Sequence, residues 1–89
     1  MKTEQNSVRF DQPQVFSADK LTTLLPDGPA EAVNQEFDNW FLVIGSLPLT
    51  TSDYGFAHGW VTSAKQLWEQ GDVHTARYQL NQVARRLEL

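Results

Sequence analysis

Residues 29–45, PAEAVNQEFDNWFLVIG, decide the fold class of this 89-residue chain. Its large apolar residues recur at offsets 0, 4, 7, 8 and 11, which is the spacing of one helical face: Val33, Phe37, Trp40, Phe41 and Ile44. Pro29 suits the first helical position, and Glu31 lies near the positive end of the helix dipole. The stretch therefore predicts an amphipathic α-helix whose apolar face lies in a core.

The end of this predicted helix, WFLVI at residues 40–44, is apolar on every side. A domain of this size has difficulty covering five consecutive large apolar side chains, so we expect part of the segment to contact another protein or a second copy of the chain. The predicted contact residues on this segment and the connection after it are Trp40, Leu42, Val43, Leu47 and Leu49. The alternative is that residues 1–25 fold back and cover the segment.

Residues 1–16 show no helical period, and Asp11-Gln12-Pro13 is a turn signal between two short apolar stretches. They are expected to form an irregular arm, a loose hairpin or a flexible tail. Ser17 is a good N-cap for a helix of about two turns that ends at Pro26 and Gly28. Residues 17–89 are therefore expected to form a single helical domain.

A helical hairpin is predicted for residues 57–89. Thr50-Thr51-Ser52-Asp53 offers several N-caps, although Gly55 and Gly59 would each cost about 1 kcal/mol inside a helix, so a start at or after Gly59 is the competing interpretation. After the turn Gln70-Gly71-Asp72, apolar residues recur at offsets 0, 3, 7, 10, 11 and 14: Val73, Ala76, Leu80, Val83, Ala84 and Leu87. The predicted fold is mainly all-α, a small bundle of three to four helices ending in an antiparallel αα-hairpin.

The hairpin resembles a single tetratricopeptide repeat in the spacing of Trp60, Ala64, Leu67, Gln70-Gly71-Asp72, Ala76, Leu80 and Val83. The resemblance covers about a third of the chain in one copy, and Ala64 stands where the family prefers Gly. It implies a peptide or protein ligand on the exposed side of the first hairpin helix. The residues that it places on that side are His58, Val61, Lys65, Trp68 and Glu69.

Catalytic and metal-binding patterns are not found in the sequence. The chain has no cysteine, and neither His58 nor His74 belongs to an HxxxH or HExxH pattern. No serine lies in a nucleophile-elbow context. We therefore expect no enzymatic activity, cofactor or metal. No stretch has the length and apolar character of a signal peptide or a membrane span, so a cytoplasmic location without membrane contact is the default expectation.

The net charge of −4 makes nucleic acid an unlikely partner. However, Arg77, Arg85 and Arg86 lie in the last thirteen residues, where they could bind phosphates or simply offset the helix dipole. The predicted function is a small non-enzymatic protein–protein interaction module, such as an adaptor, a chaperone-like subunit or an inhibitor. Its partner would be another protein or a second copy, with Trp68 as a further anchor. The alternative is a nucleic-acid-binding regulator that uses these arginines.

Overall fold

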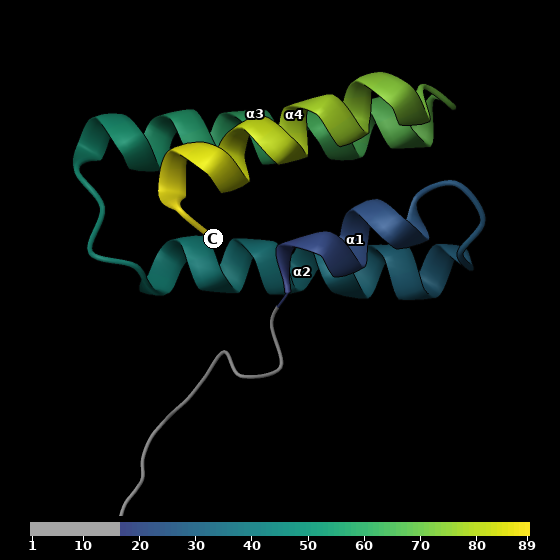
Figure 1. Ribbon diagram of the computed structural model, residues 1–89, viewed down its shortest axis with the longest axis horizontal. Helices are drawn as coiled ribbons and strands as arrows, with labels where there is room; N and C mark the ends of the chain where they lie inside the picture. The colour runs from purple at the N-terminus through teal and green to yellow at the C-terminus, as the bar shows by residue number, and fades with distance from the viewer. Residues whose placement is uncertain (1–16) are drawn as a thin grey trace, which may run out of the picture.

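The computed structural model describes residues 17–89, and helices make up most of this part of the chain. The four helices are α1 (Ala18–Leu24), α2 (Ala30–Ser46), α3 (Thr51–Glu69) and α4 (Val73–Leu87). The longest three run back and forth beside one another, and α1 lies against α2 and α4 (Figure 1). The all-α prediction is confirmed. The arm predicted for residues 1–16 lies outside the described residues.

Helix α2 begins one residue later than the sequence predicts. Pro29 has extended backbone angles, φ −61° and ψ 145°, so it is the N-cap and Ala30 is the first helical residue. The carbonyl of Pro29 accepts a hydrogen bond of 3.0 Å from the amide of Val33, which closes the first turn. Ser17 is likewise the N-cap of α1, but its side chain makes no capping hydrogen bond.

Helix α3 begins at Thr51, so the alternative start at or after Gly59 is wrong. The hydroxyl of Thr50 caps the helix by accepting a 3.0 Å hydrogen bond from the amide of Asp53. The helix then passes through Gly55 and Gly59 and buries Ala57 between them. The cap and the burial of Ala57 offset the low helix propensity of the two glycines.

The turn between α3 and α4 is a Schellman motif. The two helices pack side by side in opposite directions, which confirms the antiparallel hairpin (Figure 1). Gly71 has a φ of +92°, a value that glycine adopts without strain. Its amide donates to the carbonyl of Trp68, and the amide of Asp72 donates to that of Leu67. The Asp72 carboxylate then caps α4 by accepting a 3.1 Å hydrogen bond from the amide of Thr75.

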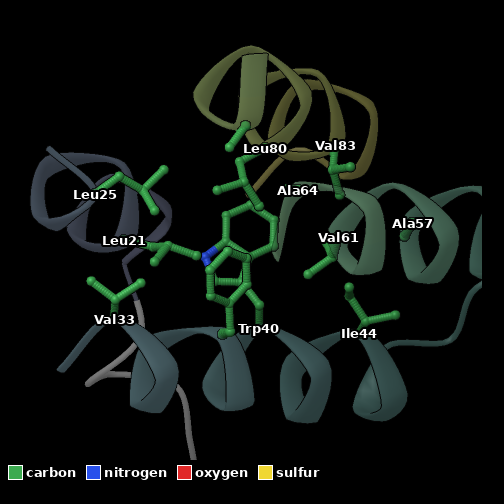
Figure 2. Close-up of a cluster of buried hydrophobic side chains, with 12 residues drawn as sticks. Leu21, Leu25, Val33, Trp40, Ile44, Ala57, Val61, Ala64, Leu80 and Val83 are labelled. Carbon is green, nitrogen blue, oxygen red and sulfur yellow. The ribbon is translucent and has the colours of Figure 1, made fainter. Parts of the chain in front are cut away.

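The core lies between all four helices, and Trp40 fills its centre (Figure 2). Its indole rises from α2 towards Leu80 of α4, while Leu21 and Leu25 of α1 close one side. The other fully or almost fully buried apolar residues are Val33, Phe37, Ile44, Ala57, Val61, Ala64, Ala76 and Val83. An ion pair ties α1 to α2, because Lys20 lies 3.2 Å from the buried carboxylate of Glu36.

Candidate protein-interaction surface

The apolar segment at residues 40–44 divides between core and solvent. Trp40 and Ile44 are buried, Phe41 and Val43 are half-buried, and the side chain of Leu42 is 71% exposed. Successive helical residues are rotated by about 100°, which places Leu42 on the side of α2 opposite the core. The prediction that part of this segment is exposed is therefore correct for Leu42, but Trp40 is not available as a contact residue.

Among the described residues before α2, those of α1 and Leu25 cover the core side of this segment. Leu21 of α1 and Leu25 at its end pack towards Trp40 (Figure 2), whereas Leu42 is exposed. The alternative that residues 1–25 cover the segment therefore holds for Trp40, which α1 helps to bury, but the described residues do not cover Leu42. Residues 1–16, which that alternative also includes, lie outside the described part of the chain.

Three aromatic rings form a row across α2 and α3, which we call the aromatic seam: Phe41, Tyr54 and His58. The ring centroid of His58 lies 5.2 Å from that of Phe41 and 5.6 Å from that of Tyr54. Tyr54 is 44% exposed, His58 is exposed and Phe41 is half-buried. These rings therefore present apolar area and polar edges to solvent at the boundary between two helices.

The sequence alone did not identify Phe41 and Tyr54 as members of a surface. Tyr54 and His58 are four residues apart, so a predicted helix beginning at Thr51 would have placed them on one helical face. The contact of His58 with Phe41 depends on how α2 packs against α3, which local spacing does not reveal.

The connection between α2 and α3 adds less exposed apolar area than predicted. Leu47 and Leu49 are half-buried, and Leu49 packs against the core. The amide of Leu49 donates a 2.9 Å hydrogen bond to the carbonyl of Leu47, which holds the connection in a tight bend. These leucines therefore lie just before α3, the helix that carries Tyr54 and His58, and do not project from the bundle.

Helix α2 covers the face that the tetratricopeptide resemblance assigns to a ligand. Val61 is fully buried, and the ring of Trp68 packs 6.0 Å from that of Phe37. Trp68 and Lys65 are half-buried, whereas His58 and Glu69 are exposed. Val61 is thus not accessible to an external ligand, and Trp68 is not the exposed anchor that the sequence suggested.

The three C-terminal arginines do not form one patch. The guanidinium of Arg86 lies 3.0 Å from a carboxylate oxygen of Asp53, and its central carbon lies 4.6 Å from the centroid of the Phe56 ring. Arg77 and Arg85 are exposed and line two neighbouring surface depressions. Helical geometry places Arg86 on a different side of α4 from Arg77, since nine residues separate them.

Within residues 17–89, no group of three or more histidine, aspartate or glutamate side chains is placed to hold a metal ion. No helix in this part of the chain has the length and apolar character needed to cross a lipid bilayer. Hydrogen bonds from the Thr75 backbone and side chain lower the pKa of the Asp72 carboxyl group.

Comparisons with known proteins give no relative. No protein-family model matches the chain, and neither a curated protein nor a solved structure matches it.

Proposed function

We propose that this chain is a non-enzymatic protein–protein interaction module, and that it binds its partner through the aromatic seam together with Leu42. The observation that carries the proposal is the exposure of Leu42, 71%, on the helix that also supplies Phe41 to the seam. An exposed large aliphatic side chain that follows Phe41 in sequence, together with the rings of the seam, gives a partner both apolar area and hydrogen-bonding groups.

The chemistry of this surface suits a protein partner. Burying the exposed part of Leu42 would contribute about 1 to 2 kcal/mol to binding. Tyr54 can bury its ring while its hydroxyl keeps a hydrogen bond, and tyrosine is common among residues that dominate binding energy. His58, whose ring contacts those of Phe41 and Tyr54, offers a ring nitrogen for a hydrogen bond. The proposed contact is therefore short-range and depends little on salt.

The experiment is photocrosslinking in the cells that naturally make the protein. A benzophenone amino acid replaces Leu42 in one variant and Gln66 in a matched control, because Gln66 is also exposed on a helix but lies away from the seam. We expect a discrete crosslinked protein from position 42 that excess wild-type chain competes away. The absence of such a product from the folded Leu42 variant, or the same product from position 66, would contradict the proposal.

Nucleic-acid binding is the weaker alternative. Arg86 is engaged with Asp53, and residues 17–72 carry eight acidic side chains against two basic ones. This net negative charge repels a polyanion over distances of about a Debye length. Two remaining arginines would give few phosphate contacts, so the binding constant would fall only gently with salt.

A further inference from the structure

Helix α4 differs in charge from everything before it in the described chain. Residues 73–87 contain three arginines, one histidine and no acidic residue, whereas residues 17–72 hold eight acids and two bases. Arg86 is neutralised by Asp53, since its Nε and one terminal nitrogen both lie within 3.1 Å of the same carboxylate oxygen. The positive charge that remains belongs to Arg77 and Arg85.

These two arginines share one side of α4 with three polar or aromatic residues. We call this side the α4 strip, and its members are His74, Arg77, Tyr78, Asn81 and Arg85. All but Arg85 line one shallow depression, and Asn81 and Arg85 line the next one along the helix. Tyr78 is 56% exposed. Because Asn81 borders both depressions, the strip is continuous along the helix.

The strip carries hydrogen-bond donors that the described chain leaves without an acidic partner. The ion pairs within residues 17–89 are those of Lys20 with Glu36 and of Arg86 with Asp53. No acid lines the depression around Arg77. Arg85 shares its depression with Asp19 and Glu88, which weaken the local positive field. Arg77 is therefore the stronger of the two anchors.

We infer that the α4 strip is a second docking surface, and that its occupant is an acidic segment of a partner protein. Arg77 and Arg85 would each bind a carboxylate, and a rise of 1.5 Å per residue separates their Cα atoms by about 12 Å along the helix. The hydroxyl of Tyr78 and the amide of Asn81 can donate hydrogen bonds to the same segment. Arginine and tyrosine are also, with tryptophan, the residues enriched where binding energy is concentrated.

The charge distribution favours this occupant over a nucleic acid. A short acidic segment brings a few carboxylates to the strip alone, whereas a nucleic acid extends a dense row of phosphates across the acidic remainder of the domain. The strip does not include any residue of the aromatic seam, so this inference stands independently of the function proposed above.

The test is an NMR titration of the full chain, with the Nε–H signals of the arginines as reporters. The probe is an alanine-rich helical peptide with glutamates at positions i and i+8, and the control is the same peptide with glutamines. We expect the glutamate peptide to shift the signals of Arg77 and Arg85 and the amides of residues 74–85. The glutamine peptide should leave them unchanged, and an equal response to both peptides would overturn the inference.

Two substitutions on the same helix provide matched controls. Arg77→Gln and Arg86→Gln each remove one positive charge, but only Arg77 belongs to the strip. We expect Arg77→Gln to weaken peptide binding by roughly three- to fivefold, as an exposed ion pair allows, and Arg86→Gln to leave it unchanged. Equal losses in both variants would mean that net charge alone is responsible, which overturns the inference.

Two further outcomes identify a different occupant and also overturn it. The first is tighter binding of a single-stranded DNA oligonucleotide that carries the same charge as the glutamate peptide. The second is concentration-dependent broadening of the α4 signals in the protein alone at low salt, which would show that the acids of a second copy occupy the strip.

Discussion

Arg86 and Asp53 join the end of α4 to the beginning of α3, with Nε and a terminal guanidinium nitrogen 3.1 Å and 3.0 Å from the same carboxylate oxygen. The guanidinium also lies over the ring of Phe56. Because both charged side chains are partly exposed, solvent screens much of their attraction. The pair nevertheless fixes the open end of the hairpin, opposite the Gly71 turn.

Replacing Arg86 by alanine is expected to lower the free energy of unfolding by about 1 kcal/mol, from the ion pair and the cation–π contact together. Asp53→Asn should cost about 0.5 kcal/mol, since it removes the ion pair and a negative charge in the first turn of α3 but keeps the cation–π contact. Urea unfolding of both single variants and the double variant gives their coupling energy. Purely additive effects at low salt would show that the two side chains do not interact in solution.

Trp40 and Leu42 provide a direct comparison of core and surface on one helix. Trp40→Ala is expected to lower the free energy of unfolding by about 3 to 5 kcal/mol, because it empties the centre of the core. Leu42→Ala should change it by less than about 0.5 kcal/mol. Similar losses from the two substitutions, measured by urea unfolding, would contradict the assigned orientation of α2.

The glycines of the hairpin are expected to respond oppositely to alanine. Beyond its chain neighbours and its own helix backbone, a Cβ at Gly55 or Gly59 would have no atom within 4 Å, so each substitution should raise the free energy of unfolding by about 0.5 to 1 kcal/mol. Gly71→Ala should lower it by about 1 kcal/mol, because the φ of +92° is strained for alanine. Thermal unfolding measures all three, and destabilisation by alanine at Gly55 would mean that α3 does not continue through it.

The cap of α4 predicts a pH dependence. Hydrogen bonds from Thr75 lower the pKa of Asp72 in the folded state, so the carboxylate stabilises the fold above its unfolded pKa, about 3.9. That stabilisation should disappear as the pH falls from about 4 through the folded-state pKa. Melting temperatures between pH 7 and pH 2.5 test this, with Asp72→Asn as the control, since asparagine caps without titrating. An unchanged acid response in that variant would exclude Asp72 as its source.

The sequence predicted the helices well because their apolar spacing is local information. Val33, Phe37 and Ile44 are core residues as their offsets require. The same offsets also place Trp40 in the core, whereas the contact surface was predicted from the length of the apolar segment and therefore included it. Among the five side chains of residues 40–44, only that of Leu42 points directly away from the core.

The surface contacts depended on tertiary packing that the sequence does not encode locally. The tetratricopeptide-like spacing leaves the side of α3 around Val61 open in an isolated hairpin, but here Phe37 and Phe41 of α2 pack on that side. Arg86 and Asp53 lie 33 residues apart, so their pairing could not be predicted from the arginine-rich end alone.

The most direct test of the proposed function is the affinity of the Leu42→Gln/Tyr54→Ala double variant for the protein crosslinked at position 42. We predict at least about a tenfold loss of affinity, since two large side chains leave the contact, with the free energy of unfolding lowered by less than about 1 kcal/mol. Unchanged affinity in the folded double variant would show that the aromatic seam and Leu42 are not the binding surface.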